Sequence, residues 1–190
     1  MSVELPEIEG FSPDQVLTLA NCRSLEQYRS MIDDYRSGRC PFCDPLDLTK
    51  NIVLYQVDGW RMWRSPFSYA HCRHFVMAPI RHVGCEDEIS VEDFTAMGKM
   101  FLFARQELGV MGGGVVMRFG GPKLSACSVL HLHTNILVPD LTGPVEATLS
   151  KHPDRQRQNI ARLRVFEFLR QGCSVDALSA EERALVEGRI

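Results

Sequence analysis

The sequence lacks a long apolar run and lacks a strong excess of either charge. None of its apolar stretches approaches the roughly 20 residues that a membrane-spanning helix needs. The N-terminal residues are acidic and have no apolar segment typical of a secretory signal, so we expect a cytoplasmic protein that does not bind membranes. The net charge of −3 argues against a nucleic-acid-binding surface, which normally carries a basic excess. A small anionic substrate stays compatible with this charge, because a few local cations can outweigh the mean field.

The cysteines do not form an even set that would predict a disulfide framework. The 190 residues include seven cysteines, an odd number at irregular spacing. In the reducing compartment that we expect, this pattern favours free thiols together with a metal site. The length suits a single domain with a sizeable core.

The N-terminal part of the chain predicts helices. Ser12-Pro13 is typical of a helix start, and Ser24 with Gln27 predicts a second start through a capping box. Gly38 predicts the end of that second helix. We therefore expect a helical extension over residues 1–39.

The central part of the chain predicts strands around one long helix. Asp58-Gly59 joins two β-prone runs and predicts a hairpin. The spacing between Ser90 and Leu108 predicts an amphipathic helix. The predicted strands span 52–57, 60–63, 74–78, 115–119 and 129–138, and the predicted buried face of the helix comprises Phe94, Met97, Phe101, Ala104 and Leu108.

The C-terminal part again predicts helices, which start at Pro153 and at Ser179 with Glu182. Helices at both ends of a strand-rich centre predict an α+β fold with an antiparallel sheet. The expected organisation is a single domain over 1–190, with a core at 40–140 and a helical extension at 141–190.

The pair Cys40 and Cys43 is the first candidate for chemistry. Two thiolates three residues apart on a turn can both reach one Zn²⁺ ion. A redox pair is the alternative, but it normally needs its first cysteine at a helix start after a strand, and here a helix precedes the pair.

The segment from His131 to Pro139 is the second candidate. On a strand, residues two apart share a face, so His131, His133 and Asn135 would project together. Such a polar face is costly to bury without partners, unless it is simply solvated. One alternative is a closed Cys₂His₂ zinc site that uses both histidines and has no catalytic role. The other uses His82 as the third ligand and leaves one histidine free beside the metal.

Three segments in order resemble the histidine triad family. The segment His131-Leu132-His133-Thr134-Asn135-Ile136-Leu137-Val138-Pro139 is similar to its motif, His-x-His-x-His followed by apolar residues. The segment from His74 to Pro79-Ile80-Arg81-His82 is similar to a Gly-His-x-apolar-apolar-x-Pro-Lys-x-His segment of the family. Cys40 and Cys43 stand upstream, where zinc-binding members carry theirs. The resemblance covers roughly residues 40–140 and leaves out both helical ends.

The resemblance implies a fold, an activity and roles for residues. It implies an α+β sheet domain, usually a homodimer, that transfers or hydrolyses nucleotides at an α-phosphorus. A structural zinc would be held by Cys40, Cys43, His82 and His131. His133 would be the nucleophile, with a backbone carbonyl such as that of Leu130 orienting its other ring nitrogen. Candidates for holding the substrate are Ser128, Cys127, Gly121, Arg118 and Lys123.

Two departures from the family pattern affect the expected activity. Asn135 stands at the third motif position in place of histidine, and Cys127 stands where the family usually has glutamine. An amide can donate to a phosphate oxygen but cannot exchange a proton as imidazole does. We therefore expect a transferase or phosphorylase at least as readily as a hydrolase, acting on dinucleoside polyphosphates or nucleotide sugars. The alternative is an inactive, zinc-stabilised nucleotide-binding or structural protein.

Overall fold

The protein is an α+β domain with one antiparallel sheet, as the order of predicted elements indicated. The computed structural model describes residues 17–43, 51–84, 88–120, 122–147, 149 and 153–187, so the predicted helix start at Ser12-Pro13 lies outside the described part. The elements are η1 (Leu19–Asn21), α1 (Leu25–Ser37), β1 (Val53–Val57), β2 (Trp60–Arg64), β3 (Cys72–Pro79), α2 (Val91–Gln106), β4 (Gly114–Met117), α3 (Pro122–Ser125), β5 (Thr134–Pro139), α4 (Pro153–Arg170), η3 (Val175–Ala177) and α5 (Ala180–Val186).

The sheet has the strand order β1-β2-β3-β5-β4, and every neighbouring pair is antiparallel. The hairpin between β1 and β2 turns at Asp58 and Gly59, whose φ angles are 47° and 74°. Positive φ at both positions matches the twist of the flanking strands, which is why an Asp-Gly pair predicted this hairpin correctly.

Helix α2 begins where the capping box predicted, and Met97 and Ala104 are buried as expected, but the buried face is rotated away from two of the predicted residues. The Ser90 hydroxyl accepts a hydrogen bond from the Asp93 backbone, and the Asp93 carboxylate accepts from the Ser90 backbone. Phe94 and Phe101 were expected in the core, yet they are 54% and 38% exposed. The Trp60 indole donates to Asp93 Oδ1 over 2.7 Å, which fixes the rotation of the helix on the sheet. The buried face therefore comprises Asp93, Ala96, Met97, Met100 and Ala104.

The last strand is shorter than the predicted run over residues 129–138. β5 begins at Thr134, and residues 130–133 approach it without strand structure. His131 and His133 therefore precede the strand, and the prediction that they share one strand face with Asn135 is wrong for these two. The apolar alternation holds, because Leu132, Ile136 and Val138 all belong to the core between the sheet and α2.

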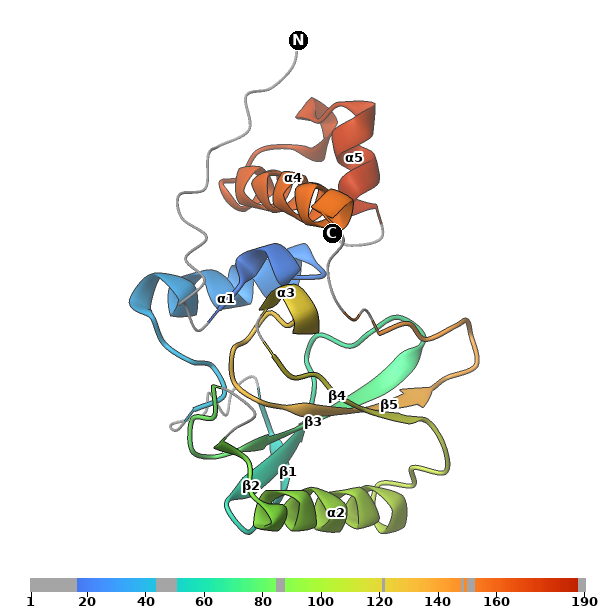
Figure 1. The fold of residues 1–190 in the computed structure, drawn as a ribbon. Helices are drawn as coiled ribbons and strands as arrows, with labels where there is room; N and C mark the ends of the chain where they lie inside the picture. Colours follow the sequence, from blue (N-terminus) through green and yellow to red (C-terminus); the bar gives the residue numbers. More distant parts are fainter. Residues whose placement is uncertain are drawn as a thin grey trace.

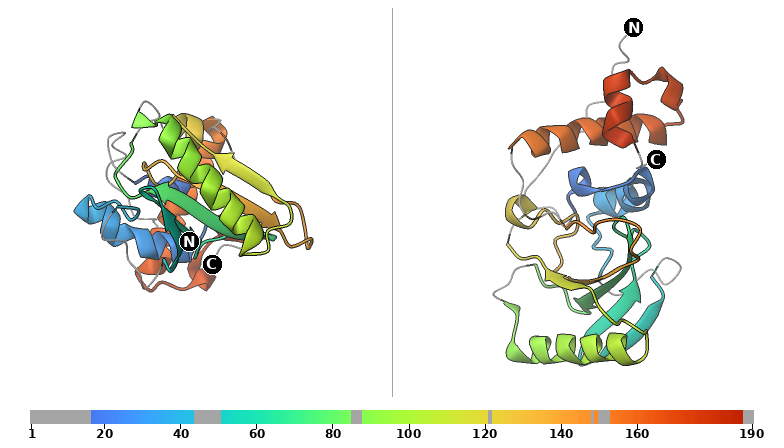
Figure 2. Two further views of the ribbon diagram at one scale, coloured as in Figure 1. Left: turned by 90° about the horizontal axis from the view of Figure 1, so that it is seen from below. Right: turned by 90° about the vertical axis from the view of Figure 1, so that its right-hand side faces the viewer.

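Helices cover the two sides of the sheet differently (Figure 1). Helix α2 packs on one face, whereas α1, α4 and α5 lie on the opposite side (Figure 2). The helices on that side have their own apolar core, which includes Tyr28, Leu163 and Phe166. Among the described residues, no helix combines the length and the apolarity that crossing a membrane requires. The candidate site lies between the sheet and the helices of the far side, where residues of α1, β2 and β3 line a common cavity.

Candidate active site and metal centre

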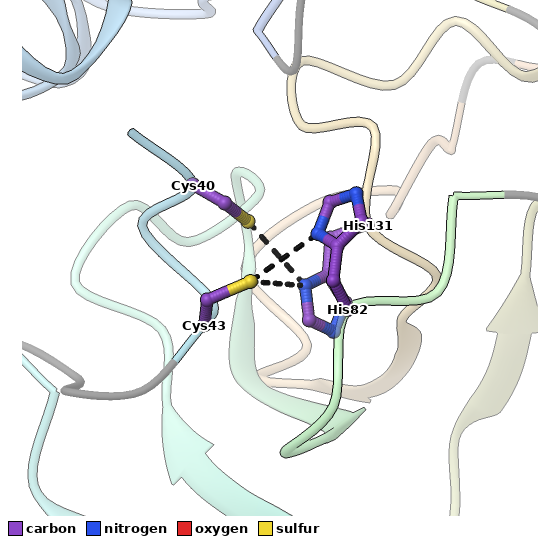
Figure 3. Close-up of side chains that lie close together, drawn as sticks. All are labelled: Cys40, Cys43, His82 and His131. Atoms are coloured by element: carbon purple, nitrogen blue, oxygen red, sulfur yellow. Dashed lines mark hydrogen bonds between the residues drawn. The ribbon is translucent and has the colours of Figure 1, made fainter. Parts of the chain in front are cut away.

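Four side chains from three separate segments converge at one point (Figure 3). Ligand atoms of Cys40, Cys43, His82 and His131 all lie within 4.8 Å of one another. Cys43 Sγ lies 3.2 Å from His82 Nδ1, and Cys40 Sγ lies 3.3 Å from His131 Nδ1. Two thiols and two imidazoles at this spacing are a donor set that fits a tetrahedral Zn²⁺ ion.

Local structure places each of these four ligands. Helix α1 ends at Gly38, whose φ of 65° is the left-handed conformation that glycine tolerates, and the two cysteines follow in the next turn. His82 follows the end of β3. His131 Nε2 lies 3.0 Å from the carbonyl oxygen of Pro79. Because a carbonyl oxygen only accepts, Nε2 carries the hydrogen, and the lone pair of Nδ1 is directed at the sulfurs.

The protonation states suit metal binding with release of a proton. Burial raises the pKa of the Cys40 thiol to about 12. Burial also lowers the pKa of His131 to about 4, so that its imidazole is neutral at pH 7. Since a metal binds the thiolate, occupation of the site would displace the thiol protons.

His133 lies beside the cluster but is not one of its four residues. It is buried, and its Nδ1 lies 2.8 Å from the carbonyl oxygen of His131. This carbonyl orients the ring, in place of the suggested Leu130 carbonyl. Nδ1 therefore carries the hydrogen, and Nε2 keeps its lone pair. Burial lowers the pKa of His133 to about 3, with Arg118 adding to the effect, so the ring is a neutral base at pH 7.

A cavity of about 340 Å³ opens next to His133. Its polar walls come from α1, from β2 and β3, and from the segment that leads into β5. The lining includes Arg23, Gln27, Ser30, Asp34, Phe42, Asn51, Trp63, His74, Arg118, Ser128, His133 and Asn135. The volume lies at the lower end of the range of roughly 300–1,000 Å³ for small-molecule sites, and it suits one nucleoside-sized group.

Phe42 connects the cysteine turn to the cavity. Its ring centroid lies 5.1 Å from that of Trp63 and 5.2 Å from that of His133, both in edge-on geometry. It also lies 6.0 Å from the His131 ring. Because Phe42 stands between the two cysteines, the position of the cysteine turn determines one wall around His133.

Asn135 is held by two partners on neighbouring strands. Its Oδ1 lies 2.8 Å from His74 Nε2, and its Nδ2 donates to the carbonyl oxygen of Val116 over 3.2 Å. Burial lowers the pKa of His74 to about 4, so this ring is neutral and donates from Nε2 to the amide oxygen. These two hydrogen bonds therefore fix the orientation of the Asn135 amide in the lining of the cavity.

The structure distributes the predicted substrate-binding residues unevenly. Ser128 and Arg118 both line the cavity next to His133. Cys127 does not line this cavity. It is buried, and its sulfur accepts a hydrogen bond from the Ser125 hydroxyl over 3.0 Å. Gly121 and the side chain of Lys123 lie outside the described residues.

Several cavity residues were not singled out from the sequence, namely His74, Arg23, Gln27, Phe42 and Asn51. For His74 a signal was present, because it stands two residues before Val76 on a predicted strand, so the two side chains share a face, and both line the cavity. Arg23 and Gln27 gave no such signal, since they surround the start of a helix that was assigned to an extension outside the core.

No family model matches the chain, and no curated protein sequence matches it. Solved structures do match it. One is a Zn-bound histidine triad family protein from Mycobacterium smegmatis, with 19% identity, a TM-score of 0.38, and coverage of 65% of this chain and 88% of that one. Another is a HIT family hydrolase from Clostridium thermocellum, with 20% identity, a TM-score of 0.43, and coverage of 57% and 96%.

A third matching structure is a hypothetical histidine triad nucleotide-binding protein from Sulfolobus tokodaii, with 13% identity, a TM-score of 0.44, and coverage of 69% and 94%. The chain is similar to histidine triad proteins. At these identities the likeness is one of fold alone.

Proposed function

We propose that the protein is a nucleotidyl hydrolase or transferase of the histidine triad type. It cleaves a nucleoside phosphoanhydride, such as a dinucleoside polyphosphate or a nucleotide sugar, through a nucleotidyl-His133 intermediate. The observation that carries this proposal is the state of His133, which is buried, neutral, and oriented by the His131 carbonyl beside a cavity. A closed zinc site using both motif histidines would need His133 as a ligand, and the four converging side chains do not include it.

The metal in this proposal is one structural zinc held by Cys40, Cys43, His82 and His131. Four protein ligands leave no open position for water, so zinc would supply conformational order and no Lewis-acid step. The cysteine turn also shapes the cavity, because its residue Phe42 contacts both Trp63 and His133.

His133 acts as the nucleophile in the first step. Its Nε2 lone pair forms a bond to the α-phosphorus, and the bond from that phosphorus to the bridging oxygen breaks. The electron pair leaves with the departing phosphate group. Nδ1–H keeps its hydrogen bond to the His131 carbonyl and stabilises the positive charge that develops on the ring. Ser128 and Arg118 line the cavity and would hold phosphate oxygens during this displacement.

An acceptor oxygen reverses the bonding in the second step. It bonds to phosphorus while the phosphorus–nitrogen bond breaks and its electrons return to Nε2. A phosphate acceptor needs no base, whereas water must lose a proton to the solvent. Asn135 cannot take that proton, because an amide does not titrate. Its engagement with His74 and Val116 instead supports a positioning role, which favours transfer to a phosphate over hydrolysis.

Mass spectrometry of the intact protein tests the proposal. The purified protein is mixed with labelled dinucleoside polyphosphates and nucleotide sugars that carry each common base, and the reaction is quenched at neutral or basic pH to preserve a phosphorus–nitrogen bond. We expect a mass increase of one nucleotidyl group on the wild type and none on His133→Ala. An adduct that persists on His133→Ala, or no adduct with any substrate, contradicts the proposed function.

A further inference from the structure

A second and larger cavity adjoins the one beside His133. Its volume is about 710 Å³, roughly twice that of the first. Five residues border both cavities and so form the boundary between them. They are Arg23, Pro66, Phe67, Arg118 and Ser128.

The walls of the second cavity come largely from the helical ends of the chain. The residues around the start of α1 form one side, and the connection between β2 and β3 forms another. Helix α4 contributes Arg155, Asn159 and Arg162. Both α1 and α4 lie outside residues 40–140, which carry the family resemblance, so the helical ends complete a cavity whose other walls come from that core.

Two arginines stand at the boundary between the cavities. The Arg23 guanidinium lies over the Tyr69 ring at 3.9 Å from its centroid. Arg118 donates from Nη1 to the Ala126 carbonyl over 3.3 Å, and its Nε is buried without a hydrogen-bond partner in the part of the chain that the structure describes. Burial lowers the pKa of Arg23, and the proximity of Arg118 adds to this shift. Two guanidinium groups whose positive charges repel each other would both be stabilised by a bound anion.

Among the remaining charged residues of this cavity, one arginine lies deeper than the carboxylates. Arg162 is partly buried and is held by Asn159 Oδ1 over 2.9 Å and by the Cys22 carbonyl over 3.3 Å. Arg155 stands at the exposed edge of the cavity. The carboxylates that line it are all exposed, where solvent and salt screen them, and they are Glu26, Glu146 and Glu187.

We propose that the second cavity binds the anionic half of the substrate, namely an oligophosphate chain and the group that it carries. The chain would run past Arg23 and Arg118, whose planar guanidinium groups suit phosphate oxygens. This ligand would be the leaving group, or the anionic acceptor that replaces it, and this role rests on the proposed function. The first cavity then holds the nucleoside part of the nucleotidyl group that is transferred to His133, and the second selects substrates with a phosphorylated partner over simple phosphoramidates.

Calorimetric titration of the zinc-loaded full-length protein with inorganic tripolyphosphate tests this site without assuming a base. We expect one binding site per chain. Arg155→Ala should weaken binding about tenfold, as expected for loss of one charge-assisted contact. Arg157→Ala is the matched control, because Arg157 lies on the same helix, pairs with Asp154 and does not line the cavity. Its affinity should stay within about twofold of the wild type.

Other outcomes overturn the inference. These are no binding of tripolyphosphate, or equal weakening by Arg155→Ala and Arg157→Ala, which would indicate a diffuse charge effect. His133→Ala should bind tripolyphosphate as the wild type does, because the ligand needs no nucleophile. Binding without any adduct on His133 would refute the proposed function alone, whereas an adduct without tripolyphosphate binding would refute the second cavity alone.

Discussion

At the scale of single residues, the two motif histidines differ in what they contact. His131 directs Nδ1 at the cysteine sulfurs, whereas His133 is hydrogen-bonded to the backbone and borders a cavity. We therefore propose that His131 binds the metal and that His133 carries the chemistry, although the two residues are only two positions apart. Their loss should have different consequences.

We predict that His131→Ala loses zinc and that His133→Ala keeps it. Removal of a zinc ligand weakens metal binding, and metal binding stabilises the fold. The melting temperature of His131→Ala should therefore fall by more than about 10 °C. That of His133→Ala should stay within about 3 °C of the wild type, because no ligand is removed. Elemental analysis and thermal unfolding provide both readouts. Equal zinc loss in the two variants would mean that both histidines bind the metal.

At the scale of elements, the approach to β4 requires a glycine. Gly113 has a φ of 142°, and a Cβ atom there would overlap the Leu137 carbonyl oxygen on β5. Gly113→Ala should therefore lower the free energy of unfolding by about 2–4 kcal/mol. Gly98→Ala is the control, because that glycine is exposed on α2 with no neighbour within 4 Å, and it should raise stability by about 0.5–1 kcal/mol. Urea denaturation measures both changes, and a neutral Gly113→Ala would show that the two strands separate readily.

Helices α1 and α4 are joined by a carboxylate whose contribution depends on pH. Glu167 accepts hydrogen bonds from Arg170 at 2.6 and 2.7 Å and from the Tyr28 hydroxyl at 2.5 Å. The bonds from Arg170, and then those from Tyr28 and Gln171, lower the pKa of Glu167 to about 2. A carboxyl group whose pKa is lower in the folded state stabilises the fold at pH values above its ordinary pKa near 4.5. This stabilisation is lost as the pH falls toward 2.

We therefore predict that Glu167→Gln is less stable than the wild type by about 3 kcal/mol at pH 7, and by roughly half that amount at pH 3. Denaturant unfolding of both proteins at the two pH values gives the difference directly. Comparison of the pair cancels the acid titration of all other groups, including any metal site. If the difference in the free energy of unfolding does not shrink at pH 3, the contact between the helices does not depend on the carboxylate charge.

At the scale of the whole molecule, the outer side of α2 leaves large apolar side chains exposed. Val91, Phe94 and Leu102 are 77%, 54% and 55% exposed. We predict a homodimer, as the family resemblance implies, with this side of α2 or the adjoining sheet edge at the interface. Light scattering at micromolar concentration should then give twice the 21.5 kDa of one chain. A monomer under these conditions would show that the exposed side chains are only solvated surface.

Short-range features were predicted well from the sequence. The hairpin at Asp58-Gly59, the capped start of α2 at Ser90 and the glycine end of α1 at Gly38 all occur where expected. Each depends on the backbone preferences of a few consecutive residues. The face that α2 buries was predicted only in part: Met97 and Ala104 are buried, but Phe94 and Phe101 are exposed, because the contact from Trp60 to Asp93 joins residues far apart in the chain.

By itself, the sequence determined the α+β order of the elements and a small set of cysteine and histidine candidates for a shared metal ion, since motif spacing and residue chemistry are local properties. Only the tertiary structure decided which histidine is left out of the cluster, because that depends on where β5 begins and on a hydrogen bond between His133 and the His131 carbonyl. It also decided that Arg23, from the helical end of the chain, meets Arg118 at the boundary of two cavities. Such convergence follows from packing between segments about 100 residues apart, which no local pattern encodes.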